Sequence, residues 1–414
     1  MDLKPKKSLT PPLKPRKHDV GSMSLNSPIN AEAVRSLRDD IPALRHFHCL
    51  NSGGVSSMPQ STFARLLALQ EKEFVYTGAH PDIRADYEEQ CHSLRRELAG
   101  LLGAQTKEVA LIRAVSEVVS FVASALTLNP RDQVILSSEE HKSGYLPWLA
   151  LRDRLGIEVV AIEATGNDEQ FINDIHQVIT SNTRAICISH VTSERGIVLP
   201  IDKVSEIGRE QEIVTIVDAA QSFGAREINV RALGCDVIAF PAFKWGLGPY
   251  GIGAMYVRQA MQDRLPPPGS GSGAAEHFDF PPGLIRLHPS AERYQYGARP
   301  YALFAGWRIS VARVANLGLA NIQKRNASLV AEARNALQDI DSVLLTPDQG
   351  QKKSGIISVG FSEISGTTAA EHCLRRHQIL CRRPHNDTAV RFCFHAFNDA
   401  GDIDAMATAI HELV

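Results

Sequence analysis

Two hydrophobic periodicities alternate along the chain between about residues 60 and 260. Stretches such as 87–103 carry apolar residues at i, i+3, i+4 and i+7, the spacing of an amphipathic helix. Between such stretches lie short runs rich in branched apolar residues: EVALI (108–112), QVILS (133–137), VVAIE (159–163), AICIS (185–189), IVTIV (213–217), VIAF (237–240) and AMYV (254–257). This alternation predicts an α/β fold with a mostly parallel seven-stranded sheet flanked by helices.

The pattern changes after residue 260 and indicates a second unit. Residues 265–283 are rich in proline and glycine and predict a loop, and residues 300–337 have the pattern of one long helix. Shorter strands and two helices follow from about residue 340, which predicts a smaller α+β C-terminal domain. We therefore expect a large domain over 31–300, in which 31–60 packs with the small domain, and a linking helix plus small domain over 301–414.

Composition narrows the class of protein. The formal net charge of −2 gives no reason to expect nucleic acid or an anionic membrane as a partner, and no apolar run reaches the ~18 residues of a membrane span. The seven cysteines have no metal-ligand spacing, so they predict no metal site and a reducing, cytoplasmic setting. The basic, proline-rich segment 1–30 predicts a disordered tail.

Lys244 and Asp218 are the most informative pair in the chain. Asp218 ends one predicted strand, and Lys244 follows the next in a glycine-rich turn flanked by Phe243 and Trp245. Apolar surroundings lower the pKa of a lysine amine, which favours imine formation, and a buried carboxylate requires a cationic partner. A surface lysine and a helix-capping acid are the alternative. Because Lys244 and Asp218 both lie at strand ends, we favour a Schiff-base lysine and the acid partner of the pyridinium nitrogen in pyridoxal 5'-phosphate.

Four further residues are candidates for the same site. Ser116 begins a predicted helix, where a phosphate could bind, although a plain helix cap explains it equally well. His141 follows a strand and could stack on a planar ring, or it could simply start a surface helix. Ser193 could bind a ring hydroxyl or could belong to a polar loop. Arg391 lies amid apolar residues and suits a substrate carboxylate, with a structural ion pair as the alternative.

The chain order Ser116, His141, Asp218, Gln221, Lys244 and Arg391 resembles that of the class V aminotransferase family of fold-type I pyridoxal-phosphate enzymes. The family includes cysteine desulfurases, selenocysteine lyases and isopenicillin N epimerase-like proteins. The resemblance covers about residues 40–414 and is most specific in VDAAQ, FKWGLGPYG and VRFCFHAFN. It implies a homodimer with the active site at the subunit interface, and these roles: Lys244 as the imine lysine, Asp218 on the ring nitrogen, Gln221 on the ring hydroxyl, His141 on the ring face, Val115 and Ser116 at the phosphate, and Arg391 on the substrate carboxylate.

The sequence departs from the desulfurase pattern at several positions. Pro241 and Phe243 stand where desulfurases place a serine and a histidine that bind the phosphate, and Ala298 replaces the threonine contributed by the partner chain. Phosphate binding is therefore reassigned to Arg299 or to backbone N–H groups. The segment after Cys381 is too short for the mobile loop that carries a desulfurase nucleophile, so Cys381 is interpreted as a buried structural thiol.

The expected function is a carbon–sulfur lyase that eliminates the β-substituent of cysteine or a cysteine S-conjugate. Asn51 and Arg383 are expected to help to bind the substrate. Epimerisation needs a second acid, for which Lys142 and His190 are the candidates; desulfuration and transamination are further alternatives. A catalytically inactive protein that keeps the fold as a scaffold is the non-enzymatic alternative.

Overall fold

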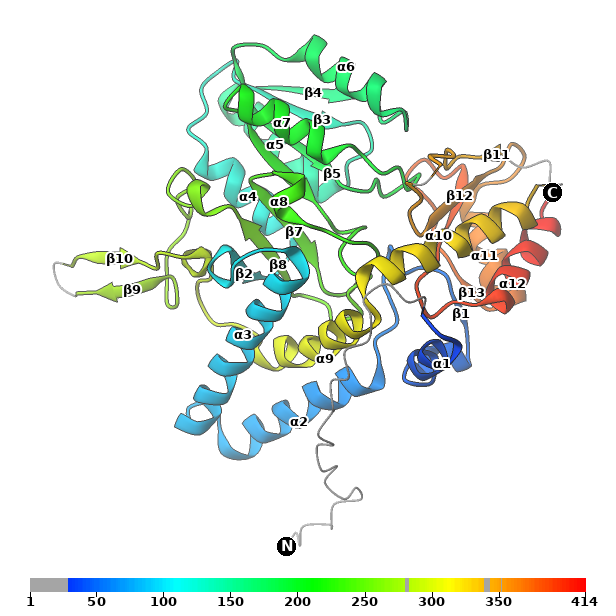
Figure 1. The fold of residues 1–414 in the computed structure, drawn as a ribbon, viewed down its shortest axis with the longest axis horizontal. Helices are drawn as coiled ribbons and strands as arrows, with labels where there is room; N and C mark the ends of the chain where they lie inside the picture. The colour runs from blue at the N-terminus through cyan, green and yellow to red at the C-terminus, as the bar shows by residue number, and fades with distance from the viewer. Residues whose placement is uncertain (1–28, 280–282, 339–342, 351) are drawn as a thin grey trace, which may run out of the picture.

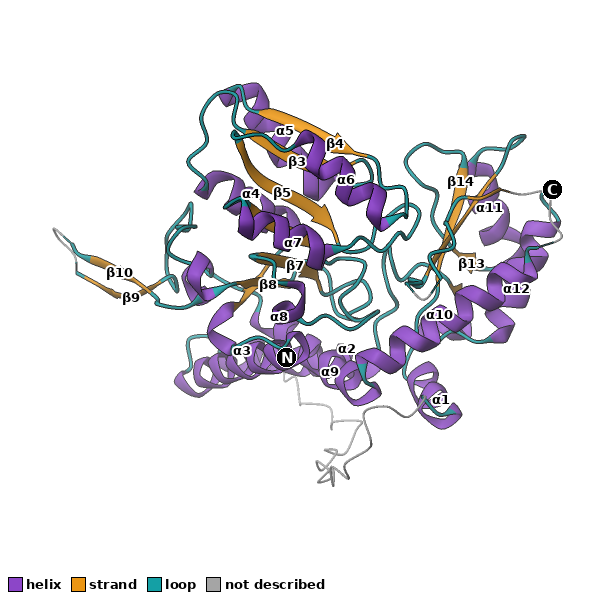
Figure 2. Ribbon diagram, turned by 45° about the horizontal axis from the view of Figure 1, so that its top comes forward, coloured by secondary structure: helices purple, strands orange, loops and turns teal. Residues whose placement is uncertain are grey.

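A seven-stranded sheet forms the centre of the larger part of the molecule (Figures 1 and 2). The computed structural model describes residues 29–279, 283–338, 343–350 and 352–414, so nearly all of the predicted tail over 1–30 lies outside the described residues. Across the sheet the strands are β2 (Val109–Ile112), β8 (Gly253–Val257), β7 (Val237–Pro241), β6 (Val214–Asp218), β5 (Thr183–Ser189), β3 (Gln133–Ser137) and β4 (Glu158–Ile162). Only β8 runs antiparallel to its neighbours. The predicted mostly parallel α/β sheet is confirmed.

Helices cover both faces of this sheet because successive strand residues point to opposite sides. Ile135 of β3 packs with Leu94 and Trp307 on one face, whereas Val134 packs with Trp148 on the other. The helices of this part are α2 (Gln60–Tyr76), α3 (Pro81–Leu102), α4 (Val115–Ala125), α5 (Lys142–Leu155), α6 (Asp168–Val178), α7 (Ile201–Glu210), α8 (Val230–Leu233) and α9 (Tyr301–Leu317). Four short 3-10 helices join them: η1 (Pro42–Arg45), η2 (Thr106–Glu108), η3 (Gln259–Met261) and η4 (Ala291–Tyr294).

The C-terminal part is a smaller α+β unit, as predicted, and lies beside the large sheet in Figure 1. Its antiparallel sheet has the order β11 (Val343–Leu344), β12 (Ile356–Gly360) and β14 (Ala389–Cys393). The helices α10 (Leu319–Ala336), α11 (Gly366–His377) and α12 (Ala400–His411) contribute side chains to one core with β12 and β14. The N-terminal helix α1 (Ala31–Asp39) packs against Phe397, and β1 (His48–Cys49) pairs with β13 (Ile379–Leu380).

Two predictions about the connecting segments were wrong. The expected single helix over 300–337 is broken at Gly318, whose φ of 79° ends α9 and whose backbone N–H bonds Val314 O and Ala315 O. The expected loop over 265–283 contains β9 (Ala275–Phe278), which pairs with β10 (Ile285–Leu287) in a hairpin that projects from the body of the molecule (Figure 1). In the described residues no helix has both the length and the apolar composition that crossing a bilayer requires.

Candidate active site

A cavity of about 310 Å³ lies beyond the carboxyl ends of β6 and β7, and five of the twelve predicted site residues line it: Lys244, Asp218, His141, Val115 and Ser116. Ser193, Gln221 and Arg391 are not among the described residues that line it. Ligand pockets typically measure ~300–1,000 Å³ and, in open α/β sheets, form at this edge. The cavity is lined by Gly54, Ala114, Val115, Ser116, His141, Ser143, Asp218, Ala220, Pro241, Phe243, Lys244 and Arg382. A larger cavity of about 530 Å³ lies beside the β9–β10 hairpin, but the described residues that line it include no lysine, arginine or histidine.

Lys244 and Asp218 are both buried and influence each other's charge. Burial lowers the pKa of Lys244, the Asp218 carboxylate opposes this shift, and Arg391 and Arg382 add to it, so that the resulting pKa is about 8. Burial also raises the pKa of Asp218, and the Lys244 ammonium opposes that shift. Asp218 Oδ1 accepts a hydrogen bond from Ala220 N at 2.8 Å. The amine is therefore readily deprotonated near neutral pH, as the sequence predicted.

The turn that carries Lys244 is held rigidly from several sides. Leu247 N donates to Lys244 O at 3.0 Å, and Leu247 itself has a φ of 55°. Trp245 Nε1 donates to Gln221 Oε1 at 2.9 Å. At Gly248, a Cβ atom would lie 2.4 Å from Trp307 Cδ1, so only glycine fits there. The fixed turn directs the lysine into the cavity.

His141 is a neutral imidazole at the start of α5. Its Nδ1 accepts a hydrogen bond from Ser143 N at 3.2 Å, which leaves the proton on Nε2. Burial lowers the pKa of His141 to about 4, and Lys244 contributes to the shift. A neutral ring on the cavity wall suits the predicted stacking role.

The N-terminus of α4 lines the cavity and could bind an anion. The helix begins at Val115, and Ser116 Oγ donates to Ser143 Oγ at 3.0 Å. Among the described residues, no acceptor bonds the backbone N–H groups of Val115 and Ser116. Free N–H groups at a helix start favour a phosphate. Pro241 and Phe243 also line the cavity and supply no phosphate ligand, as the sequence indicated.

Arg391 presents an unsatisfied guanidinium in the protein interior. The side chain is 1% exposed, and its Nη1 donates to Ser193 O. Its Nε and Nη2 have no hydrogen-bond partner among the described residues. A buried guanidinium without a partner is costly, so this geometry indicates an anionic ligand. Arg382, whose backbone pairs with that of Arg391 in an antiparallel bridge, lines the cavity.

The structure does not bring every predicted residue to the cavity. Arg383 is about half exposed, and its Nη1 lies 3.7 Å from Asp387 Oδ1. The adjacent Arg382, and not Arg383, is among the residues that line the cavity. Gln221 donates from Nε2 to Gly53 O at 2.9 Å and accepts from Trp245, so both ends of its amide are engaged. Asn51 lies next to Gly54, and its Oδ1 has no partner among the described residues.

Ala298 and Arg299 do not line the cavity of their own subunit. Arg299 lies close enough to Cys91 of α3 to affect the pKa of that thiol, and its Nη1 is buried without a partner among the described residues. Their contribution to a second subunit's site stays a prediction. The two candidates for a second acid, Lys142 and His190, are likewise absent from the described lining.

Glu140 is a buried acid that the sequence analysis missed. It accepts hydrogen bonds from Ser189 N at 2.8 Å, Ser189 Oγ at 2.7 Å and Ser137 Oγ at 2.5 Å. Burial raises its pKa to about 7. Glu140 therefore ties the ends of β3 and β5 together directly before His141. The sequence signal for Glu140 was an acid that follows one strand ending in a serine, Ser137, while another strand ends in Ser189.

A buried lysine beside a buried carboxylate, a helix start for a phosphate and a free arginine define a pocket of the pyridoxal-phosphate type. Residues 50–406 match the model of the family described as "Aminotransferase class-V". The chain belongs to this family, whose cofactor is pyridoxal 5'-phosphate, and the predicted resemblance is confirmed.

Relatives and solved structures agree with this assignment. The chain is 27% identical over 401 residues to a "Probable cysteine desulfurase" of Methanothermobacter thermautotrophicus, covering 92% of this chain and 98% of the relative. It is 24% identical over 396 residues to one of Pyrococcus abyssi, covering 91% and 97%. An apo cysteine desulfurase of Thermococcus onnurineus superposes with a TM-score of 0.82 at 24% identity, over 92% of this chain and 98% of that one. The cystine C-S lyase C-DES gives 0.82 at 19%, over 89% and 98%.

The Lys244–Asp218 pair predicts a pH dependence of cofactor attachment. In cofactor-free protein, covalent uptake of added pyridoxal phosphate requires the neutral amine, so its rate should rise with pH and reach half its maximum near the pKa of about 8. Asp218→Asn removes the charge that opposes burial, so the half-point should shift to lower pH. Absorbance stopped-flow measures both profiles, with the exposed Asp202→Asn as the matched control. An unchanged half-point in Asp218→Asn would contradict the coupling.

Proposed function

We propose that this protein is a pyridoxal-phosphate carbon–sulfur lyase that acts on cysteine or a cysteine S-conjugate. The observation that carries the proposal is the site itself: Lys244 and Asp218 line the cavity, and Arg391, which has two unpartnered nitrogens among the described residues, lies close enough to affect the pKa of Lys244. No cysteine is among the described residues that line the cavity. Elimination needs no thiol nucleophile, whereas desulfuration does. Family membership and the names of the relatives support a substrate with a carbon–sulfur bond.

The cofactor, when bound, accepts electron density from the substrate Cα. Asp218 would hold a proton at the ring nitrogen, and the N-terminus of α4 would bind the phosphate. Arg391 binds the substrate carboxylate and so orients the Cα–H bond. The Lys244 amine, once free, removes the Cα proton, and the β-sulfur leaves as a thiol. Water then converts the remaining carbon skeleton to pyruvate and ammonia.

A second subunit completes the proposed enzyme. We propose a homodimer in which Ala298 and Arg299 of one subunit reach the phosphate side of the other. The domain boundaries stay a proposal from the sequence: a large domain over 31–300, and a linking helix with a small domain over 301–414.

Cysteine desulfuration is the second candidate, because the relatives carry that name. It requires a reactive thiolate near the substrate. Cys381 does not fit, since a hydrogen bond with Cys373 and burial raise its pKa well above the ordinary value of a thiol. Cys393 is fully buried, and Gly53 packs directly against it. The thiols therefore favour elimination.

The products of L-cysteine distinguish the two reactions. A lyase consumes water and releases pyruvate, sulfide and ammonia, whereas a desulfurase releases alanine and leaves a persulfide on the protein. We expect pyruvate and sulfide in equal amounts, and Cys381→Ser should keep at least about half of the activity because the thiol takes no part. Lactate dehydrogenase coupling and amino-acid analysis measure the products. Alanine as the main product, lost in Cys381→Ser, would refute the lyase; inversion at Cα without pyruvate would indicate an epimerase.

A further inference from the structure

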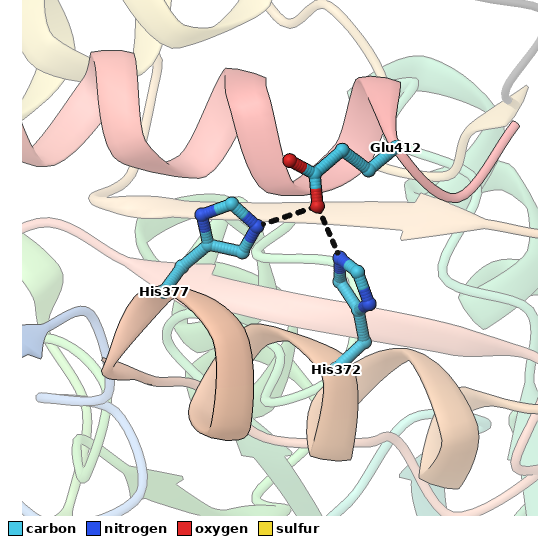
Figure 3. Close-up of side chains that lie close together, drawn as sticks. All are labelled: His372, His377 and Glu412. Atoms are coloured by element: carbon cyan, nitrogen blue, oxygen red, sulfur yellow. Dashed lines mark hydrogen bonds and ion pairs between the residues drawn. The ribbon is translucent and has the colours of Figure 1, made fainter.

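Two imidazoles and one carboxylate converge on the surface of the C-terminal unit, on elements that contribute no residue to the candidate active-site cavity. Figure 3 shows His372 and His377 of α11 directed at Glu412, which follows α12. Glu412 Oε2 lies 3.1 Å from His372 Nε2 and 2.9 Å from His377 Nε2. The possible ligand atoms of the three residues all lie within 4.8 Å of one another. We propose that His372, His377 and Glu412 bind a divalent transition-metal ion of the Zn²⁺ class.

The orientation of His372 supports a shared ligand rather than a simple hydrogen bond. Its Nε2 is inaccessible to solvent and, among the described residues, has no group aligned to hydrogen-bond it, although Glu412 Oε2 is only 3.1 Å away. Close contact without hydrogen-bond alignment is the relation between two ligands whose lone pairs point to a common ion. His377, by contrast, does hydrogen-bond the same oxygen.

The separations match a coordination sphere. Zinc binds imidazole nitrogen and carboxylate oxygen at ~2.0–2.2 Å, which places neighbouring tetrahedral ligands roughly 3.3 Å apart. The two nitrogen–oxygen separations, 2.9 and 3.1 Å, approach this value, so small side-chain rotations admit the ion. Two imidazoles favour zinc, cobalt, nickel or copper over magnesium and calcium, which prefer oxygen ligands.

Electrostatics at the cluster also favour a cation. His377 is the last residue of α11, and Glu412 caps α12, so the negative ends of two helix dipoles face the cluster. Arg375, which also lies on α11, pairs with Glu371, and its Nη2 lies 3.5 Å from Glu371 Oε2. The Glu412 side chain is about half exposed, so the carboxylate side of the cluster is open to solvent.

This site extends the sequence analysis, which predicted no metal because it considered the cysteines. Three protein ligands leave at least one coordination position for water. The ion would join the ends of α11 and α12 and so stabilise the C-terminal unit. The proposal is independent of the proposed lyase function, because these residues touch neither the cavity nor Lys244.

Titration of the cofactor-loaded, full-length protein with Co²⁺ tests the site. We expect one Co²⁺ per chain, with visible d–d bands and no thiolate-to-metal charge-transfer band, and displacement by Zn²⁺. His372→Gln, His377→Gln and Glu412→Gln should each weaken binding by more than the about 10–100-fold that loss of an outer-shell partner costs. Zn²⁺ should raise the thermal midpoint of the wild type but not that of these three variants.

His411→Gln is the matched control. His411 precedes Glu412, but its ring lies 2.8 Å from Ala407 O in its own helix, so its loss should leave binding unchanged. Circular dichroism checks that each variant is folded. The proposal is overturned if the wild type binds no Co²⁺, if the three variants bind as the wild type does, or if a thiolate band shows that cysteine is the ligand.

Discussion

Lys244→Ala should reduce turnover of a sulfur-containing amino acid on the order of 10⁴-fold, because the proposed mechanism assigns to one amine both the attachment of the cofactor and the removal of the Cα proton. The residue is buried at the cavity, and its pKa of about 8 makes the amine available as a base near neutral pH. The variant should also release its cofactor on dialysis. Steady-state kcat and the visible absorbance of the dialysed protein measure the two effects.

Lys203→Ala is the control for this loss. Lys203 is exposed on α7, so its replacement should change neither kcat nor the absorbance. If Lys244→Ala retained a few per cent of wild-type turnover, another group would be the base. An inactive scaffold is excluded if the wild type turns over any sulfur-containing amino acid.

Arg391→Met should cost about 2–5 kcal/mol of transition-state binding, roughly 30- to 4,000-fold in kcat/KM. The guanidinium leaves Nε and Nη2 without partners among the described residues, which is the state expected of a group reserved for a substrate carboxylate. Arg391→Lys should lose less, because it keeps the charge but not the bidentate geometry.

The free energy of unfolding of Arg391→Met distinguishes a substrate-binding role of Arg391 from a structural role. Methionine removes a buried, incompletely paired charge at similar volume, so the free energy of unfolding of Arg391→Met should stay equal or rise. A structural ion-pair arginine would show the opposite sign. Denaturant unfolding gives the comparison, with the exposed Arg375→Met as a control that should alter neither kinetics nor stability. Loss of stability with intact kcat/KM would contradict the substrate role.

Strand ends carried most of the information that the sequence provided. Asp218 and Lys244 were identifiable because apolar runs stop at or just before them, and the carboxyl ends of neighbouring strands meet at one edge. His141 and Ser116 follow strands in the same way and do line the cavity. The seven strands were found because each contains a short, nearly continuous apolar run, even though β4 is only partly buried and β8 is antiparallel.

The residues that the sequence misplaced depend on tertiary contacts. Arg382 and Arg383 are adjacent, so only the backbone pairing of Arg382 with Arg391 decides which one faces the cavity. Gln221 is held by Gly53 and Trp245, which lie far from it in the chain. The break at Gly318 was hidden because apolar periodicity continues on both sides of it.

Borohydride reduction of the purified protein, followed by peptide mass mapping, tests the central claim most directly. Reduction makes a lysine-linked cofactor permanent, so the pyridoxyl-phosphate mass should be found on the peptide that contains Lys244 and should be absent from Lys244→Ala. Modification of a different lysine, or a protein that takes up no pyridoxal phosphate, would contradict the account.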